Sequence, residues 1–192
     1  MKHWFKLAVV GAGMALGTAA QASTIEVWND TQYDVPANTV ANRGSVTCTS
    51  CEVLTYNPSS FTFSSTTGEL FDGPTNSGDA TEAAWVNTVL GTSFTTADVT
   101  AGKVSTGIFD SYSYTTSAQY VILKIGKNPD YTVLMNTSGG AMTWSWNNYK
   151  ADGGGLSHYI TLGDPAPVPL PAAGLLLLGA LGGLAAVRRR KA

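Results

Sequence analysis

The sequence contains few of the residues that usually carry chemistry. Among its 192 residues there are two cysteines and two histidines, and charged residues make up only 12% of the chain. One histidine, His3, lies at the extreme N-terminus, which leaves His158 and the two cysteines for the rest of the chain. A zinc site needs about four such ligands. We therefore expect no metal site and no cofactor.

Positive charge is also scarce in the central part of the chain. Residues 23–164 hold all thirteen acidic residues and only five basic ones, a net charge of −8. A domain with this balance repels nucleic acid and anionic lipid. We expect no nucleic-acid partner, and the acidity is typical of a protein that stays soluble outside the cell.

The N-terminus has the pattern of an export signal. Lys2 and Lys6 are followed by an apolar run over residues 7–19, and Ala20 and Ala22 form a small-residue cleavage site. This pattern predicts that the first 22 residues are a signal peptide removed by signal peptidase. The alternative is an uncleaved N-terminal anchor.

The C-terminal end contains the longest uncharged apolar stretch. Residues 172–187 have no charged or hydrogen-bonding side chain, and as a helix they would cover about 24 Å of hydrocarbon. Four cationic residues follow and form the start of a basic tail over residues 188–192: Arg188, Arg189, Arg190 and Lys191. The positive-inside rule places this tail in the cytoplasm and the preceding domain outside. We expect a single transmembrane helix over residues 172–187.

A proline-containing linker over residues 165–171 leads into this helix. It contains the start of a pentapeptide formed by Val168, Pro169, Leu170, Pro171 and Ala172. The two prolines hold the backbone extended, which is the form that a protease groove accepts. Pentapeptide, short Leu/Gly/Ala helix and Arg cluster together resemble the PEP-CTERM class of bacterial sorting signals, in its VPLPA-CTERM variant.

This resemblance covers about the last 25 residues. It implies recognition by an exosortase, an integral-membrane cysteine transpeptidase, in a Gram-negative bacterium that makes exopolysaccharide. The chain would cross the inner membrane, be held there as a single-pass protein before processing, and then reach the cell envelope or extracellular matrix. A plain single-pass anchor with a proline-rich linker is the alternative.

Residues 23–164 are long enough for one exported domain with its own core. Their composition favours β-structure, and a turn-rich segment over residues 68–78 reads as a long loop. The strands that alternation predicts are residues 24–28, 45–48, 51–56, 61–63, 117–125, 131–136, 141–147 and 156–162. We expect a mainly β fold: an antiparallel, jelly-roll-like β-sandwich with one short helix.

That helix is predicted over residues 79–91. Asp79 stands in the capping position with Glu82 as its reciprocal partner in a capping box, and Gly91 ends the helix. The acidic start, E-A-A-aromatic run and L-G end of this helix loosely resemble an element of PEP-CTERM proteins. The closing strand, which contains Ser157 and His158, resembles another element of the same family.

Two sets of residues could carry chemistry. Cys48 and Cys51 form a C-x-x-C with β-like sequence on both sides, which favours a local disulfide over the alternative redox or metal roles. Ser157 and His158 are neighbours in a strand and point to opposite faces, so they cannot act on each other. We interpret His158 as a histidine at the core edge, because no orienting acid is singled out.

Two further patterns have a plain and a functional interpretation. Oxygen ligands over residues 72–82 could bind calcium, but their spacing does not match a known calcium loop, so a solvated loop is favoured. Trp144 and Trp146 share one face of a strand whose other face is polar. This alternation favours a core position, with a carbohydrate-binding platform as the alternative.

We therefore expect a non-enzymatic exported protein with no catalytic residues, structural or adhesive in an exopolysaccharide or biofilm setting. Its expected partners are signal peptidase, an exosortase-type transpeptidase, the inner membrane before processing and, as an open alternative, exopolysaccharide. The alternatives are a carbohydrate-binding module and a secreted hydrolase that uses a pair of carboxylates.

Overall fold

The computed structural model describes residues 22–29, 42–57, 60–74, 76–108, 111–126, 130–148 and 155–164. The predicted signal peptide lies outside the described residues except for Ala22, and so do the pentapeptide 168–172, the apolar segment 172–187 and the basic tail 188–192. Within the described ranges, no helix is both long enough and apolar enough to cross a bilayer.

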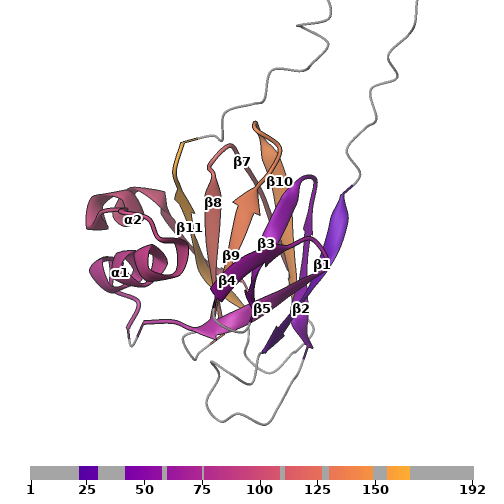
Figure 1. Cartoon of the computed structure of the whole chain (residues 1–192), viewed down its shortest axis with the longest axis horizontal. Helices are drawn as coiled ribbons and strands as arrows, with labels where there is room; N and C mark the ends of the chain where they lie inside the picture. Colours follow the sequence, from indigo (N-terminus) through magenta and orange to yellow (C-terminus); the bar gives the residue numbers. More distant parts are fainter. Residues whose placement is uncertain are drawn as a thin grey trace, which may run out of the picture.

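The described chain is mainly β, as predicted, with eleven strands and two short helices (Figure 1). The strands are β1 (Ser23–Asn29), β2 (Asn42–Cys48), β3 (Cys51–Asn57), β4 (Ser60–Ser64), β5 (Thr67–Asp72), β6 (Lys103–Ile108), β7 (Ser111–Thr116), β8 (Tyr120–Ile125), β9 (Asp130–Asn136), β10 (Met142–Asn148) and β11 (Leu156–Leu162). The helices are α1 (Asp79–Leu90) and α2 (Thr96–Gly102).

The strands form one continuous curled sheet. Its order is β6-β11-β8-β9-β5-β1-β2-β10-β7, and β3 joins it by pairing with β9 and with β4. A sandwich requires two separate sheets, and here the strands are joined into one. The joining strand is β5, which pairs in parallel with β1 and antiparallel with β9. The glycine and acidic residues of β5 predict a loop, so the sequence does not indicate that this segment connects β1 to β9.

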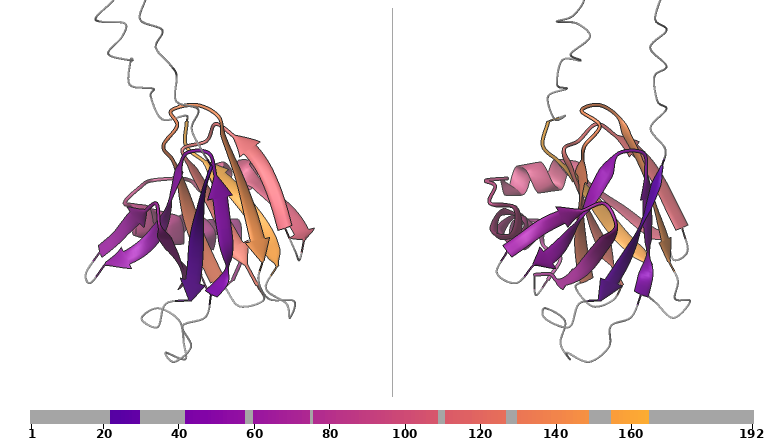
Figure 2. Two further views of the ribbon diagram at one scale, coloured as in Figure 1. Left: turned by 90° about the vertical axis from the view of Figure 1, so that its right-hand side faces the viewer. Right: turned by 45° about the vertical axis from the view of Figure 1, so that its right-hand side comes forward.

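Two apolar cores lie on opposite faces of this sheet. The inner core fills the concave side and includes Trp144, Trp146 and Tyr159. The helix-side core lies between the sheet and the two helices, which cover the face formed by β8, β9 and β11 (Figure 2). β8 contributes to both, since Leu123 faces the inner core and Ile122 the helix-side core. This explains its apolar run over residues 120–123, because a strand buried on both faces does not alternate.

Helix α1 confirms the predicted helix but not its start. Gly91 ends it in the left-handed conformation, with φ 65°. The capping box expected from Asp79 and Glu82 is wrong: Gly78 occupies the N-cap and no side chain caps the helix. The capping box lies instead at α2, a helix that was not predicted, where Thr95 and Asp98 bond reciprocally.

β6 and β7 were not predicted either. They occupy residues 103–108 and 111–116, which are rich in serine and threonine and contain few apolar residues. Both are edge strands of the sheet. An edge strand buries fewer side chains than a central one, so its sequence carries a weaker apolar pattern.

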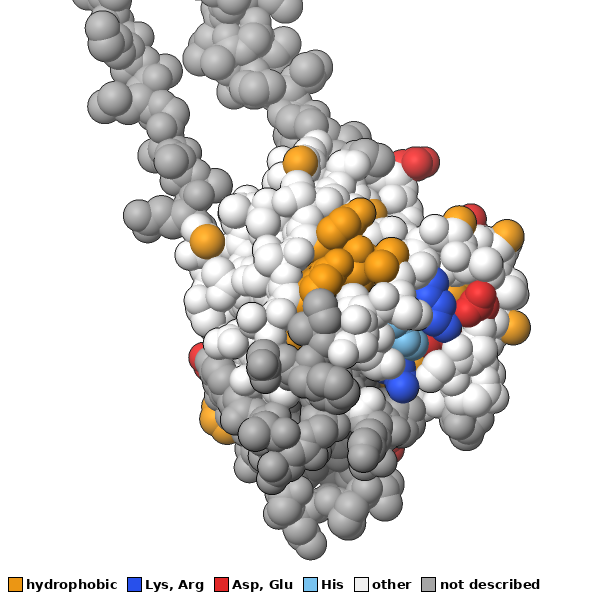
Figure 3. Space-filling view, turned by 180° about the vertical axis from the view of Figure 1, so that it is seen from behind, with side chains coloured by type: hydrophobic (Ala, Val, Ile, Leu, Met, Phe, Trp, Pro, Cys, Tyr) orange, Lys and Arg blue, Asp and Glu red, His pale blue; other side chains and the backbone are white. Residues whose placement is uncertain are grey.

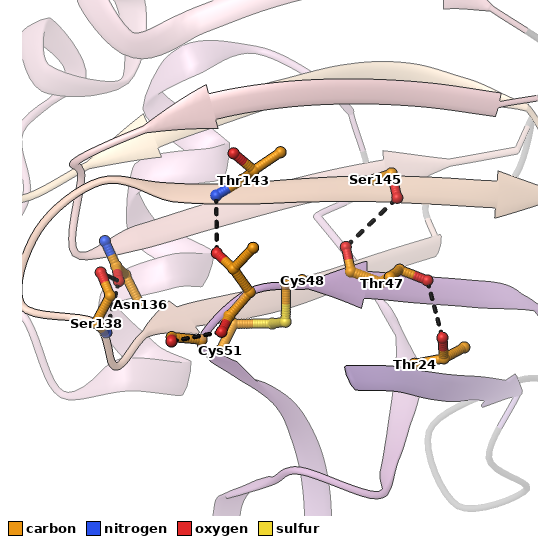
Figure 4. The surroundings of a disulfide bond; sticks show 10 residues. Thr24, Thr47, Cys48, Cys51, Asn136, Ser138, Thr143 and Ser145 are labelled. Carbon is orange, nitrogen blue, oxygen red and sulfur yellow. Dashed lines mark hydrogen bonds between the residues drawn. A yellow bond between two sulfur atoms is a disulfide. The ribbon is translucent and has the colours of Figure 1, made fainter. Parts of the chain in front are cut away.

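Cys48 and Cys51 form the predicted disulfide. Their Cα atoms are 5.9 Å apart, and the bond joins the end of β2 to the start of β3 (Figure 4). Backbone hydrogen bonds hold the connection on both sides: Thr49 donates to the Thr143 carbonyl at 3.1 Å, and Thr137 donates to the Ser50 carbonyl at 3.1 Å. The disulfide therefore fixes the connection between β2, which pairs with β10, and β3, which pairs with β9.

We expect reduction of this disulfide to lower the free energy of unfolding by about 2 kcal/mol, because the loop that it closes is very short. Denaturant titrations with and without reductant measure the difference. A Cys48→Ser, Cys51→Ser chain gives the matched control, since it should not respond to reductant. A loss of folding on reduction would contradict this expectation.

Candidate functional site

The most unusual group of side chains surrounds one buried acidic residue in α1. We call it the Glu82 cluster. On the back face of the molecule, basic, acidic and histidine side chains lie close together (Figure 3). The cluster draws on the segment before α1, on α1 itself and on three strands, and its members are Ser77, Asp79, Glu82, Lys103, Tyr131 and His158.

Both carboxylate oxygens of Glu82 are hydrogen-bonded inside the protein. Glu82 is only 1% exposed. Its Oε1 accepts from the Tyr131 hydroxyl at 2.6 Å and lies 2.8 Å from His158 Nε2. Its Oε2 accepts from Lys103 Nζ at 2.7 Å. Because a carboxylate oxygen only accepts hydrogen bonds, His158 Nε2 carries the hydrogen of this contact and is its donor.

Lys103 connects Glu82 to the surface. Its Nζ also donates to Asp79 Oδ1 at 2.9 Å and to the Ser77 carbonyl at 2.8 Å. An ammonium group has three donors, so all three are used. Asp79 is held in turn by the Thr100 hydroxyl, 2.5 Å from its Oδ2. This contact ties α2 to α1 through the same cluster.

The electrostatics keep the central pair charged. Burial alone would raise the pKa of the Glu82 carboxyl, but hydrogen bonds from His158, Lys103 and Tyr131 outweigh burial and lower that pKa. Burial likewise acts to lower the pKa of Lys103, and its contacts with Glu82 and Asp79 raise it overall. Burial and the Glu82 hydrogen bond raise the pKa of Tyr131. At neutral pH the cluster therefore holds a carboxylate, an ammonium and a neutral phenol.

We expect acid to weaken the fold through Glu82. Its pKa in the folded chain is below the ordinary value of 4.5. The unfolded chain then binds the proton more readily, so the stabilisation is complete above that value and is lost as pH falls through the folded pKa. Melting temperatures measured between pH 7 and pH 2 should fall in this acid range. Glu82→Gln should show a shallower fall, whereas an identical pH profile in the variant would contradict this assignment.

The arrangement is suited to fastening rather than to catalysis. Every polar atom of Glu82 and every donor of Lys103 is bonded to another protein group, and His158 is 4% exposed. A catalytic base must reach a proton on its substrate. No hydrogen bond joins Ser157 to His158 in the part of the chain that the structure describes. The cluster instead joins α1 to β6, β9 and β11.

The region considered for calcium has other roles. Asn76 Oδ1 accepts from the Gly78 backbone at 2.9 Å and from the Thr81 hydroxyl at 2.6 Å, which shapes the turn before α1. Asp79 and Glu82 bind Lys103. Within the described ranges, no group of three or more His, Cys, Asp or Glu side chains is placed to hold a metal ion.

Trp144 and Trp146 belong to the inner core. They are 0% and 1% exposed. This confirms the interpretation from alternation, and the alternative of a glycan platform on these two indoles is wrong, because a sugar could not reach them. Trp144 packs against Tyr159 and Tyr112, with ring centroids 5.3 and 5.8 Å apart.

Three members of the cluster, Asp79, Glu82 and His158, are predicted from the sequence with other roles. Asp79 and Glu82 are predicted to form a capping box, and His158 is predicted at the core edge with no orienting acid, whereas His158 lies 2.8 Å from the Glu82 carboxylate. Lys103 and Tyr131 were missed. Glu82 lies 21 residues from Lys103, 49 from Tyr131 and 76 from His158, so no local spacing could reveal the contacts.

Comparison with known proteins adds no relative. No protein-family model matches the chain, and neither a curated protein nor a solved structure matches it.

Proposed function

We propose that this chain is an exported, non-enzymatic protein of the cell envelope or extracellular matrix, with a structural or adhesive role, whose C-terminal signal is processed by an exosortase. One observation carries the proposal. The last strand of the domain ends at Leu162, and the pentapeptide, the apolar run and the four basic residues follow it in that order from Val168 onward. A folded unit followed directly by such a tail is the layout of a sorted cargo.

Two features of the domain support this proposal. A buried disulfide suits an oxidising compartment outside the cytoplasm. The Glu82 cluster uses its polar groups internally, which suits a domain that must keep its shape rather than turn over a substrate. The net charge of −8 over residues 23–164 favours solubility outside the cell.

One observation favours a hydrolase as the second candidate. The Glu82 carboxylate lies 2.8 Å from His158 Nε2, and an acid that orients a histidine is one part of a nucleophilic triad. Turnover of glycan or ester substrates, lost in His158→Gln while the fold is retained, would establish this alternative. We expect no turnover, because His158 is buried and no nucleophile is bonded to its ring among the described residues.

Fractionation of the native host tests the proposed sorting. An epitope tag is inserted in the exposed turn at residues 65–66, and three chains are compared: the intact chain, a deletion of residues 168–172, and a chain in which these five residues are reordered. The reordered chain keeps length and hydropathy, so it separates recognition of the motif from simple membrane anchoring.

We expect only the intact chain to leave the inner membrane and to lose its C-terminal end. The two altered chains should stay full length in the membrane. If all three chains stay full length in the membrane, the tail is an anchor and the sorting proposal fails. If all three leave it shortened, processing does not depend on the pentapeptide, and the proposal fails as well.

A further inference from the structure

Strand β7 is an unprotected edge of the sheet. Among the described residues it pairs only with β10, and the strand order ends there. Proteins usually protect such edges with charge, proline or a bulge. The sequence Ser-Tyr-Ser-Tyr-Thr-Thr of β7 has no charged residue and no proline, and its register with β10 runs without a shift.

The other end of the sheet is protected in these ways. β6 begins with Lys103 and contains Gly107 at φ 59°, and its register with β11 is interrupted between Leu156 and His158. β4 is also an uncharged edge, but its Phe61 and Phe63 are partly buried against the helix-side core. In β7, by contrast, Tyr114 is 39% exposed.

The hydrogen bonds of β10 show which backbone groups of β7 are unpaired. The Thr143 carbonyl accepts from the Thr49 amide at 3.1 Å, so the backbone groups of Thr143 point toward β2. Successive residues alternate in direction, so those of Trp144 point toward β7, where its partner is Tyr114. The β7 residues whose backbone groups then point away from β10 are Ser111, Ser113 and Thr115.

These three residues make β7 complementary to itself. We propose that β7 pairs antiparallel with β7 of a second copy of this chain, about a two-fold axis at Ser113. In this register Ser113 lies opposite the partner's Ser113, and Ser111 lies opposite the partner's Thr115. Each opposed pair then exchanges both backbone hydrogen bonds. Tyr112 lies opposite the partner's Tyr114, in the closer, non-hydrogen-bonded type of pair, which favours contact between the rings.

Symmetry favours a second copy as the occupant, and the uncharged sequence of β7 permits it. Residues 23–164 carry a net charge of −8, which opposes self-association in general, but β7 itself brings no like charges together. A two-fold pairing uses the same edge in both copies, so it closes at a dimer and does not propagate. The inference does not rest on the proposed sorting and stands or fails separately from it.

Cysteine substitution tests this register in the full-length chain, purified in mild detergent. The two native cysteines are paired with each other, so an introduced cysteine is the only free thiol. In Ser113→Cys the two Cα atoms would lie about 5.5 Å apart, within reach of a disulfide. We expect a disulfide-linked dimer under mild oxidation.

Three comparison chains make the test specific. Thr115→Cys alone should not cross-link, because the two thiols would lie about 13 Å apart along the strands. Mixing Thr115→Cys with Ser111→Cys should restore the cross-link. Thr62→Cys in β4 should not cross-link, because its thiol lies outside the β7 pairing.

A second measurement keeps the test independent of cross-linking. Ser113→Pro removes the amide that points to the open edge and also the hydroxyl that donates to the Trp144 carbonyl at 3.2 Å. The backbone groups that pair with β10, those of Tyr112 and Tyr114, are kept, and Ser113→Ala is the control that loses the hydroxyl alone. We expect light scattering to show a dimer for the wild-type chain and for Ser113→Ala, and a monomer for Ser113→Pro with a similar melting temperature. A monomeric wild type at all concentrations, equal cross-linking of Thr115→Cys alone and Ser113→Cys, preferential cross-linking through Thr62→Cys, or a dimer that survives Ser113→Pro would each overturn the proposal.

Discussion

Glu82→Leu is expected to lower the free energy of unfolding by about 3–5 kcal/mol, because it removes the buried carboxylate of an ion pair and leaves the donors that converge on it without their acceptor. The Lys103 ammonium would lose its contact at 2.7 Å, and the Tyr131 hydroxyl would lose its acceptor at 2.6 Å. Denaturant titration of the purified chain, followed by circular dichroism, measures this change.

Two further variants separate charge from packing. Glu82→Gln keeps the shape and one carbonyl acceptor, so its cost should lie between those of the wild type and Glu82→Leu. Glu82→Leu combined with Lys103→Met also removes the ammonium that has lost its buried partner, and it should be more stable than Glu82→Leu alone. A Glu82→Leu chain as stable as the wild type would show that the cluster does not fasten the helices to the sheet.

The sequence predicted the central strands and α1 because these elements bury a regular pattern of apolar side chains. β8, β9, β10 and β11 all fall within or close to their predicted ranges. The pattern does not fix how strands pair over long distances. β5 was read as loop, yet it joins β1 to β9 and makes the sheet continuous. The capping-box pattern at Thr95 and Asp98 could have revealed α2, because it is a local signal.

The candidate site was less predictable than the fold. A glutamate in the first turn of a helix favours a capping role on local grounds. Glu82 instead points to the sheet, because three donors from distant parts of the chain meet there. Such a contact depends on the packing of α1 against β9 and β11, which no single segment specifies. The disulfide was predictable, since Cys48 and Cys51 are separated by only 3 positions.

Trp144→Ala is expected to lower the free energy of unfolding by about 3–5 kcal/mol, the range for removal of a buried aromatic side chain. Trp144 is 0% exposed, and its ring lies among Tyr112, Tyr114 and Tyr159. The alanine variant would leave a cavity where β10 faces these tyrosines. Denaturant titration with the wild-type chain under the same conditions measures the loss.

Neighbouring substitutions show whether burial is the cause. Ser145→Ala changes the opposite face of β10 and removes only a long hydrogen bond to the Thr47 carbonyl, at 3.4 Å, so it should lower the free energy of unfolding by no more than about 1 kcal/mol. Trp144→Phe should cost less than Trp144→Ala, because the indole N–H has no hydrogen-bond acceptor among the described residues and only volume is lost.

A role for Trp144 in sugar binding makes the opposite prediction: Trp144→Ala would lose retention on the host's polysaccharide while the fold stayed as stable as before. Because the indole is buried, we expect any loss of retention to accompany loss of the fold.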